Sequence, residues 1–153
     1  KMMSKIVGAL NELVVDTPFD RALLLKATNG GKLPQPGSQL FVHVFAEMHN
    51  ERLRSVKHRF GKREVDSSYV ALLDDLVRRK TMPVHTSELR PGLLKTVYEA
   101  HNVTVSLLVL VASLDGCLWY LSLNARDEVP IDARTLEAAQ SFGARTRDHL
   151  RIT

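Results

Sequence analysis

The chain has 153 residues, of which 44% are hydrophobic and 25% are charged, and its formal net charge is +4. These values are typical of a globular domain and exclude an intrinsically disordered chain. The single cysteine, Cys117, excludes an internal disulfide framework and a cysteine-rich zinc site. The length predicts one domain with a core large enough to fold without such cross-links.

The longest apolar run covers residues 105–112 and is too short to span a bilayer, and no segment resembles a signal peptide. We therefore expect a cytoplasmic protein that makes no contact with a membrane. The chain begins with lysine, so we expect it to be part of a longer protein.

An amphipathic helix is predicted at the start of the chain. Over residues 4–14, Ile6, Leu10 and Leu13 lie along one helical face. This face has more apolar residues than a terminal helix needs in order to pack against its own domain. We therefore expect the segment 1–16 to pair with a second copy in a homodimer.

The next segments are predicted as a helix, a strand and a second, weaker strand. Pro18 suits the first turn of a helix over residues 18–28, which ends before a glycine pair. Residues 40–47 are β-branched and aromatic on both faces, which indicates a buried strand. The chain then turns back into a strand over residues 52–63.

That second strand carries a cluster of six lysines and arginines within residues 52–63. We interpret the cluster as the solvated face of an edge hairpin, where positive charges discourage aggregation. The alternative is a nucleic-acid surface, but no nucleic-acid motif accompanies the cluster. We expect no tight binding of nucleic acid by this domain alone.

Three elements are predicted in the middle of the chain. Asp66 and Ser67 are both suitable N-caps for a helix over residues 67–80. Residues 81–89 contain proline and β-branched residues and are predicted to be extended. A short helix over residues 91–101 follows.

The last third of the chain gives the clearest structural signal. Asp115 and Gly116 lie between two apolar runs, residues 103–113 and 117–124, and this arrangement predicts a hairpin because glycine takes positive φ readily. Both runs are apolar at nearly every position, so both faces of the sheet must be covered. Asp132 is predicted to cap a closing amphipathic helix.

This order of elements resembles the GAF family of sensory domains, which are relatives of PAS domains. The amino-acid sequence resembles that family over residues 72–89, 93–126 and 131–150. The resemblance implies a single α+β domain over residues 1–153, with its core over 18–150. It implies an antiparallel five- or six-stranded sheet with the terminal helices on one face. A pocket covered by helices and loops is implied on the other face.

The resemblance also implies that this pocket binds a small molecule. The candidate ligand-binding residues are Val84, His85, Leu94, Tyr98, His101, Trp119 and Leu121. Tyr98 and Trp119 suit plain core packing as well as pocket lining, and the two histidines suit ordinary loop and helix-end positions as well as ligand or haem contacts. Trp119 and Tyr120 stand where the family often has a small residue, so we expect a narrowed or filled pocket.

Catalytic motifs are absent from the sequence, and the lone cysteine has no resolving partner. We therefore expect no enzyme and no metal site. The expected function is small-molecule sensing and dimerisation within a signalling or transcriptional regulator, which contacts nucleic acid only through an attached output domain. Neither the ligand nor a cofactor is identified by the sequence.

Two other functions fit the residues. One is a ligand-free structural module that only dimerises, its pocket filled by Trp119 and Tyr98. The other is a small stand-alone enzyme that uses the histidines. A cavity of roughly several hundred Å³ on the sheet face would favour sensing, whereas a packed face would favour the structural module. A histidine–carboxylate or histidine–cysteine contact on that face would favour the enzyme.

Overall fold

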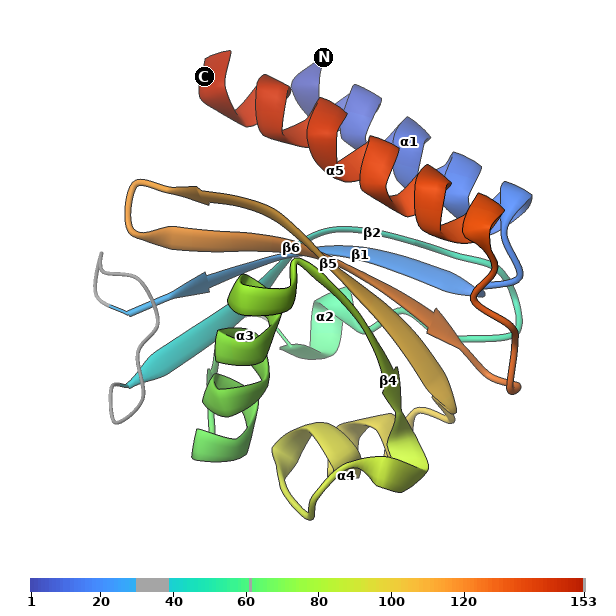
Figure 1. Ribbon diagram of the computed structural model, residues 1–153, viewed down its shortest axis with the longest axis vertical. Helices are drawn as coiled ribbons and strands as arrows, with labels where there is room; N and C mark the ends of the chain where they lie inside the picture. The colour runs from blue at the N-terminus through green and yellow to red at the C-terminus, as the bar shows by residue number, and fades with distance from the viewer. Residues whose placement is uncertain (30–38, 61, 153) are drawn as a thin grey trace.

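The computed structural model describes residues 1–29, 39–60 and 62–152 (Figure 1). The helices are α1 (Met2–Asp16), α2 (Lys57–Phe60), α3 (Ser67–Arg79), α4 (Leu93–Ala100) and α5 (Ala133–Ile152), and a 3-10 turn, η1, covers Thr86–Glu88. The strands are β1 (Arg21–Thr28), β2 (Leu40–His49), β3 (Lys62–Val65), β4 (Thr81–His85), β5 (Val105–Leu114) and β6 (Cys117–Ala125).

The strands form one six-stranded antiparallel sheet in the order β3-β2-β1-β6-β5-β4. The terminal helices α1 and α5 lie side by side over one face, and α3 and α4 lie on the other (Figure 1). This arrangement confirms the predicted α+β class and the predicted covering of both sheet faces.

Strand β1 corrects the prediction of a helix over residues 18–28. The segment pairs along its whole length with β6 on one side and with β2 on the other, so it lies in the middle of the sheet. Leucine, alanine and lysine favour helices, but pairing with two neighbouring strands outweighs that modest local preference. Arg21 and Leu23 therefore point to one face, and Ala22 and Leu24 to the other.

The basic segment 52–63 is also different from its prediction, because it forms the short helix α2 and the short strand β3 instead of one strand. Arg52 at its start forms ion pairs with Asp20 and Asp127. Acidic groups thus neutralise part of the cluster. The expectation that this domain does not bind nucleic acid tightly stays a prediction.

The local signals near the C-terminus are confirmed. Asp115 and Gly116 have φ values of 53° and 74°, as the tight turn between β5 and β6 requires. The N–H of Thr135 donates to Oδ1 of Asp132 at 2.8 Å, so Asp132 caps α5. Among the residues that the structure describes, no helix is both long and apolar enough to cross a membrane.

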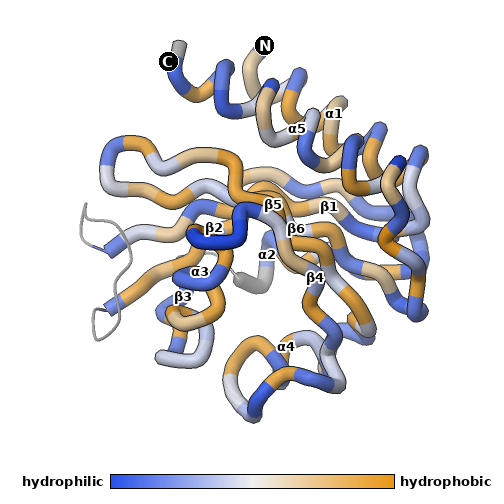
Figure 2. The backbone as a smooth tube through the Cα atoms, viewed as in Figure 1, coloured by the Kyte–Doolittle hydropathy of each residue, from blue (hydrophilic) through white to orange (hydrophobic). Residues whose placement is uncertain are grey.

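Two hydrophobic cores lie on either side of the sheet. Apolar residues follow the strands and the inner sides of the terminal helices (Figure 2). Ile6, Leu10 and Leu13 of α1 are buried in the core that the sheet forms with the two terminal helices. Because this face of α1 is buried by its own domain, it does not by itself require a second copy, and the homodimer stays a prediction.

Candidate functional site

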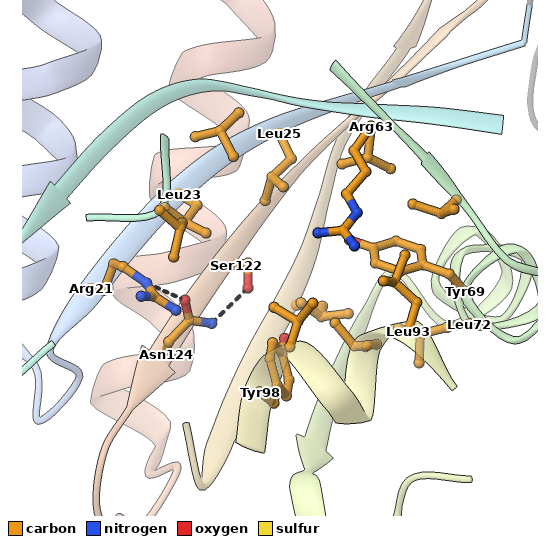
Figure 3. Close-up of a pocket in the computed structure, with 17 residues that line it drawn as sticks. Arg21, Leu23, Leu25, Arg63, Tyr69, Leu72, Leu93, Tyr98, Ser122 and Asn124 are labelled. Carbon is orange, nitrogen blue, oxygen red and sulfur yellow. Dashed lines mark hydrogen bonds between the residues drawn. The ribbon is translucent and has the colours of Figure 1, made fainter. Parts of the chain in front are cut away.

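A narrow cavity lies between the sheet and helices α3 and α4 (Figure 3). Its volume is about 50 Å³. This space holds a few atoms, whereas ligand pockets usually measure roughly 300–1,000 Å³. The lining residues are Leu23, Leu25, Val42, Val44, Val56, Val65, Tyr69, Leu72, Leu93, Leu94, Val97, Tyr98 and Leu108, with Arg21, Arg63, Ser122 and Asn124.

A buried polar network forms one end of this mostly apolar cavity. Nε of Arg21 donates to Oδ1 of Asn124 at 2.8 Å. The amide nitrogen of Asn124 donates to the hydroxyl oxygens of Ser106 and Ser122, each at 2.9 Å. Arg21 is 2% exposed and Asn124 is 0% exposed. Figure 3 shows Arg21 and Asn124 together beside Ser122, with Tyr98 nearby.

The hydroxyl of Tyr98 lies near the same network. Burial raises the pKa of Tyr98, while its interactions with the hydroxyls of Ser106 and Ser122 and with the charge of Arg21 oppose that rise. The phenol is therefore neutral near pH 7 and is able both to donate and to accept a hydrogen bond.

Asp66 joins the two helices that cover the cavity. Its carboxylate accepts hydrogen bonds from the N–H of Tyr69 at 3.0 Å, the hydroxyl of Ser68 at 2.7 Å and the N–H of Leu93 at 2.9 Å. Burial raises the pKa of Asp66, but these hydrogen bonds outweigh it and the pKa is lowered on balance. Of the two N-caps that the sequence allowed, Asp66 is the one that caps α3.

Replacing Asp66 by alanine should lower the free energy of unfolding by about 1–2 kcal/mol, because an N-cap and the link to α4 are lost. Since the pKa is lowered by folding, this contribution is present above about pH 4 and disappears as the pH falls through the folded-state pKa. Urea denaturation at neutral and acidic pH measures it. Ser67→Ala, at the neighbouring exposed position, is the control, and equal losses in the two variants would contradict the assignment.

Three of the predicted site residues lie on the cavity side of the sheet. Leu94 and Tyr98 line the cavity, and Val84 is buried in the same core without lining it. His85 is placed elsewhere: its Nδ1 lies 3.1 Å from Oε1 of the exposed Glu128. This histidine–carboxylate contact is at the end of edge strand β4, outside the cavity.

The remaining predicted residues do not line the cavity. His101 is half-buried at the end of α4. Trp119 and Leu121 lie in the core between the sheet and the terminal helices, where the Trp119 ring meets Phe45 edge-on at 5.0 Å and Nζ of Lys26 lies 5.3 Å from its centroid. The expectation that Trp119 shares a cavity with Tyr98 is therefore wrong.

Strand periodicity explains this correction. Successive side chains of β6 point to opposite faces, so Tyr120, Ser122 and Asn124 face the cavity side while Trp119 and Leu121 face the terminal helices. Both faces of the strand are buried, and the apolar pattern alone does not distinguish them. Tyr120 does occupy the cavity side, where its hydroxyl lies 2.6 Å from that of Tyr69.

The sequence prediction missed the polar network itself. Arg21 was missed because its segment was assigned to a helix. A usable signal was present in β5 and β6, because Ser106, Ser122 and Asn124 interrupt otherwise apolar runs, and the last two are two residues apart. Buried polar residues on one strand face indicate a hydrogen-bonded site.

No protein-family model matches the sequence, and no curated protein does. Solved structures are similar in fold. The phycocyanobilin-bound GAF domain of a cyanobacterial phytochrome has a TM-score of 0.70 and 17% identity, over 98% of this chain and 84% of that one. The GAF domain of a two-component sensor histidine kinase from Bacillus halodurans has a TM-score of 0.65 and 11% identity, over 98% of this chain and 96% of that one. These likenesses confirm the GAF-like fold that the resemblance implied.

Proposed function

We propose that this chain, which has the GAF-like fold, senses a small molecule in the cavity between its sheet and helices α3 and α4. The observation that carries the proposal is the hydrogen-bonded network of Arg21, Ser122 and Asn124 at one end of an apolar cavity. A few convergent polar groups in an apolar pocket are typical of small-molecule sites. The similar domain from a cyanobacterial phytochrome holds phycocyanobilin, which supports a ligand-binding role for this fold.

The proposed role is binding and not catalysis. The Tyr98 phenol, whose pKa burial raises, and the Asn124 amide form hydrogen bonds but neither gains nor loses a proton near neutral pH. We place the domain in a cytoplasmic signalling or transcriptional regulator, where it also pairs with a second copy. The likeness to a sensor histidine kinase domain supports the signalling part of this proposal.

Strand β6 offers a route for the signal across the sheet. Ser122 and Asn124 face the cavity, while the intervening Leu123 lies in the core beneath the terminal helices. A ligand that prefers one arrangement of the cavity walls shifts the population of that arrangement. We propose that the shift reaches α1 and α5, which lie together on the far side of the sheet (Figure 1).

Thermal unfolding in the presence of a metabolite panel tests the proposal. A true ligand at a hundred times its Kd stabilises the fold by about 2.7 kcal/mol, which raises the Tm of a domain of this size by roughly 5–10 °C. Val97→Phe, which fills the cavity from α4, should abolish that rise. The matched control is Val77→Phe at an exposed position of α3, which should keep it. A panel without a stabilising compound, or equal responses of the two variants, would contradict the proposal.

The ligand-free structural module is the second candidate. The small volume of the cavity, about 50 Å³, favours it, since larger ligands need the walls to move. It predicts that no compound of the panel stabilises the protein and that Val97→Phe and Val77→Phe behave alike.

A further inference from the structure

The buried guanidinium of Arg21 donates hydrogen bonds to two neutral acceptors. Nε donates to the amide oxygen of Asn124 and Nη1 to the backbone carbonyl of Arg54, each at 2.8 Å. Among the ion pairs within 4.0 Å that the described residues form, none includes Arg21. A charge on a side chain that is only 2% exposed is costly unless an opposite charge or strong hydrogen bonds compensate it.

The acidic side chain whose charge acts on Arg21, that of Glu47, is hydrogen-bonded to other groups. Its carboxylate accepts hydrogen bonds from the Ser55 hydroxyl and from the N–H groups of Val56 and Lys57. Burial remains the largest influence on the pKa of Arg21 and lowers it. The protein thus compensates this cation only in part.

Asp20, the residue before Arg21, is occupied in the same way. Its carboxylate accepts from the Asn50 amide and from the N–H of Arg126, each at 2.9 Å, and it forms an ion pair with Arg52 at 3.3 Å. The carboxylate therefore joins the ends of β1, β2 and β6 and does not face the cavity network.

The cavity has a positive character. Arg21 and Arg63 are among its lining residues, and the described lining includes no aspartate or glutamate. Figure 3 shows the Arg63 side chain extending from β3 toward the cavity, opposite the Arg21 network. In a site of low polarity, the buried guanidinium of Arg21 favours an anion over a neutral molecule of the same shape.

We propose that the ligand of this cavity is a small monocarboxylate with a short apolar body. Its carboxylate would accept hydrogen bonds from Arg21, and its alkyl group would contact Leu23, Leu25 and Leu108, which line the same space. The small volume selects a short alkyl chain. This inference rests on the proposed sensing function and adds the chemical class of the ligand.

Titrations with propionate, its neutral isostere propionamide and inorganic phosphate test the inference, read by ¹H–¹⁵N correlation spectra. Propionate should bind at least about tenfold more tightly than propionamide, because a charge-assisted hydrogen bond is lost in the amide. Phosphate lacks an apolar body and should bind more weakly than propionate. Arg21→Gln should weaken propionate binding by roughly 10- to 100-fold.

Arg54→Gln is the matched control for the loss of one positive charge. The Arg54 side chain is exposed, and its backbone carbonyl, which accepts from Arg21, is kept in the variant. Propionate affinity should change less than about twofold, as expected for a surface charge. Arg63→Gln, on the exposed edge strand, gives a test that does not alter the buried network, and it should weaken propionate binding severalfold.

Equal affinities for propionate and propionamide would overturn the inference, as would tighter binding of phosphate than of propionate. Equal effects of Arg21→Gln and Arg54→Gln in folded proteins would overturn it too. If no carboxylate binds while a neutral metabolite stabilises the protein and Val97→Phe abolishes that effect, the anion assignment is wrong and the sensing function stands. The sensing function itself fails when no compound of the metabolite panel stabilises the protein, or when Val97→Phe and Val77→Phe respond equally.

Discussion

Replacing Trp119 by alanine is expected to lower the free energy of unfolding by roughly 3–5 kcal/mol, the usual cost of removing a large side chain from a core. Trp119 is 8% exposed, and its ring packs edge-on against Phe45 between the sheet and the terminal helices. Part of the loss comes from the aromatic pair and from the nearby ammonium of Lys26. Guanidinium denaturation followed by circular dichroism measures the change.

Val15→Ala is the control for this prediction, because Val15 is 71% exposed on α1 and its truncation should cost less than about 0.5 kcal/mol. Trp119 is the only tryptophan, so its fluorescence reports this core alone. We expect the blue emission of a buried indole. A red, water-exposed emission, or a loss no larger than that of Val15→Ala, would show that the face of β6 is assigned wrongly.

Replacing Asn124 by leucine should lower the free energy of unfolding by roughly 2–4 kcal/mol, because hydrogen-bond partners are left unsatisfied in a buried site. The variant removes the acceptor of Arg21 Nε and the donor to Ser106 and Ser122. Ser122→Ala, which removes one hydroxyl of the same network, should cost only about 1 kcal/mol. Urea denaturation of the three proteins gives both values.

A double variant separates the network from simple loss of volume. Arg21→Met combined with Asn124→Leu replaces both partners of the central hydrogen bond by apolar groups, which is often close to neutral. The double variant should therefore be more stable than Asn124→Leu alone, with an interaction energy above about 0.5 kcal/mol. Additive losses would mean that the bond between Arg21 and Asn124 contributes little.

The hairpin turn and the helix caps were predicted correctly because neighbouring residues determine them. Asp115 and Gly116 supply the two positive φ angles of the hairpin turn, and Asp66 and Asp132 supply helix caps within three residues of the N–H groups that they bind. Such signals lie within a few positions of one another in the sequence. They therefore predict local structure without any knowledge of the distant chain.

The candidate site was predicted only in part because it depends on pairing between distant segments. Arg21 meets Asn124, 103 residues away, only after residues 21–28 have become a strand, and local helix preference pointed the other way. Trp119 was assigned to the wrong face because β6 is buried on both. Leu94 and Tyr98 line the cavity on the side where the family resemblance implied a pocket, and their contact with a ligand stays a prediction.

The central claim is that a small molecule binds on the Arg21 and Tyr98 side of the sheet. The most direct test is a ¹H–¹⁵N correlation spectrum titrated with the panel compound that raises the Tm most. We predict saturable shifts that are largest at Leu23, Tyr98 and Ser122, with smaller shifts in α1 and α5. Shifts that are largest on the terminal helices while Tyr98 and Ser122 stay unchanged would contradict the claim, and so would a panel in which no compound produces saturable shifts.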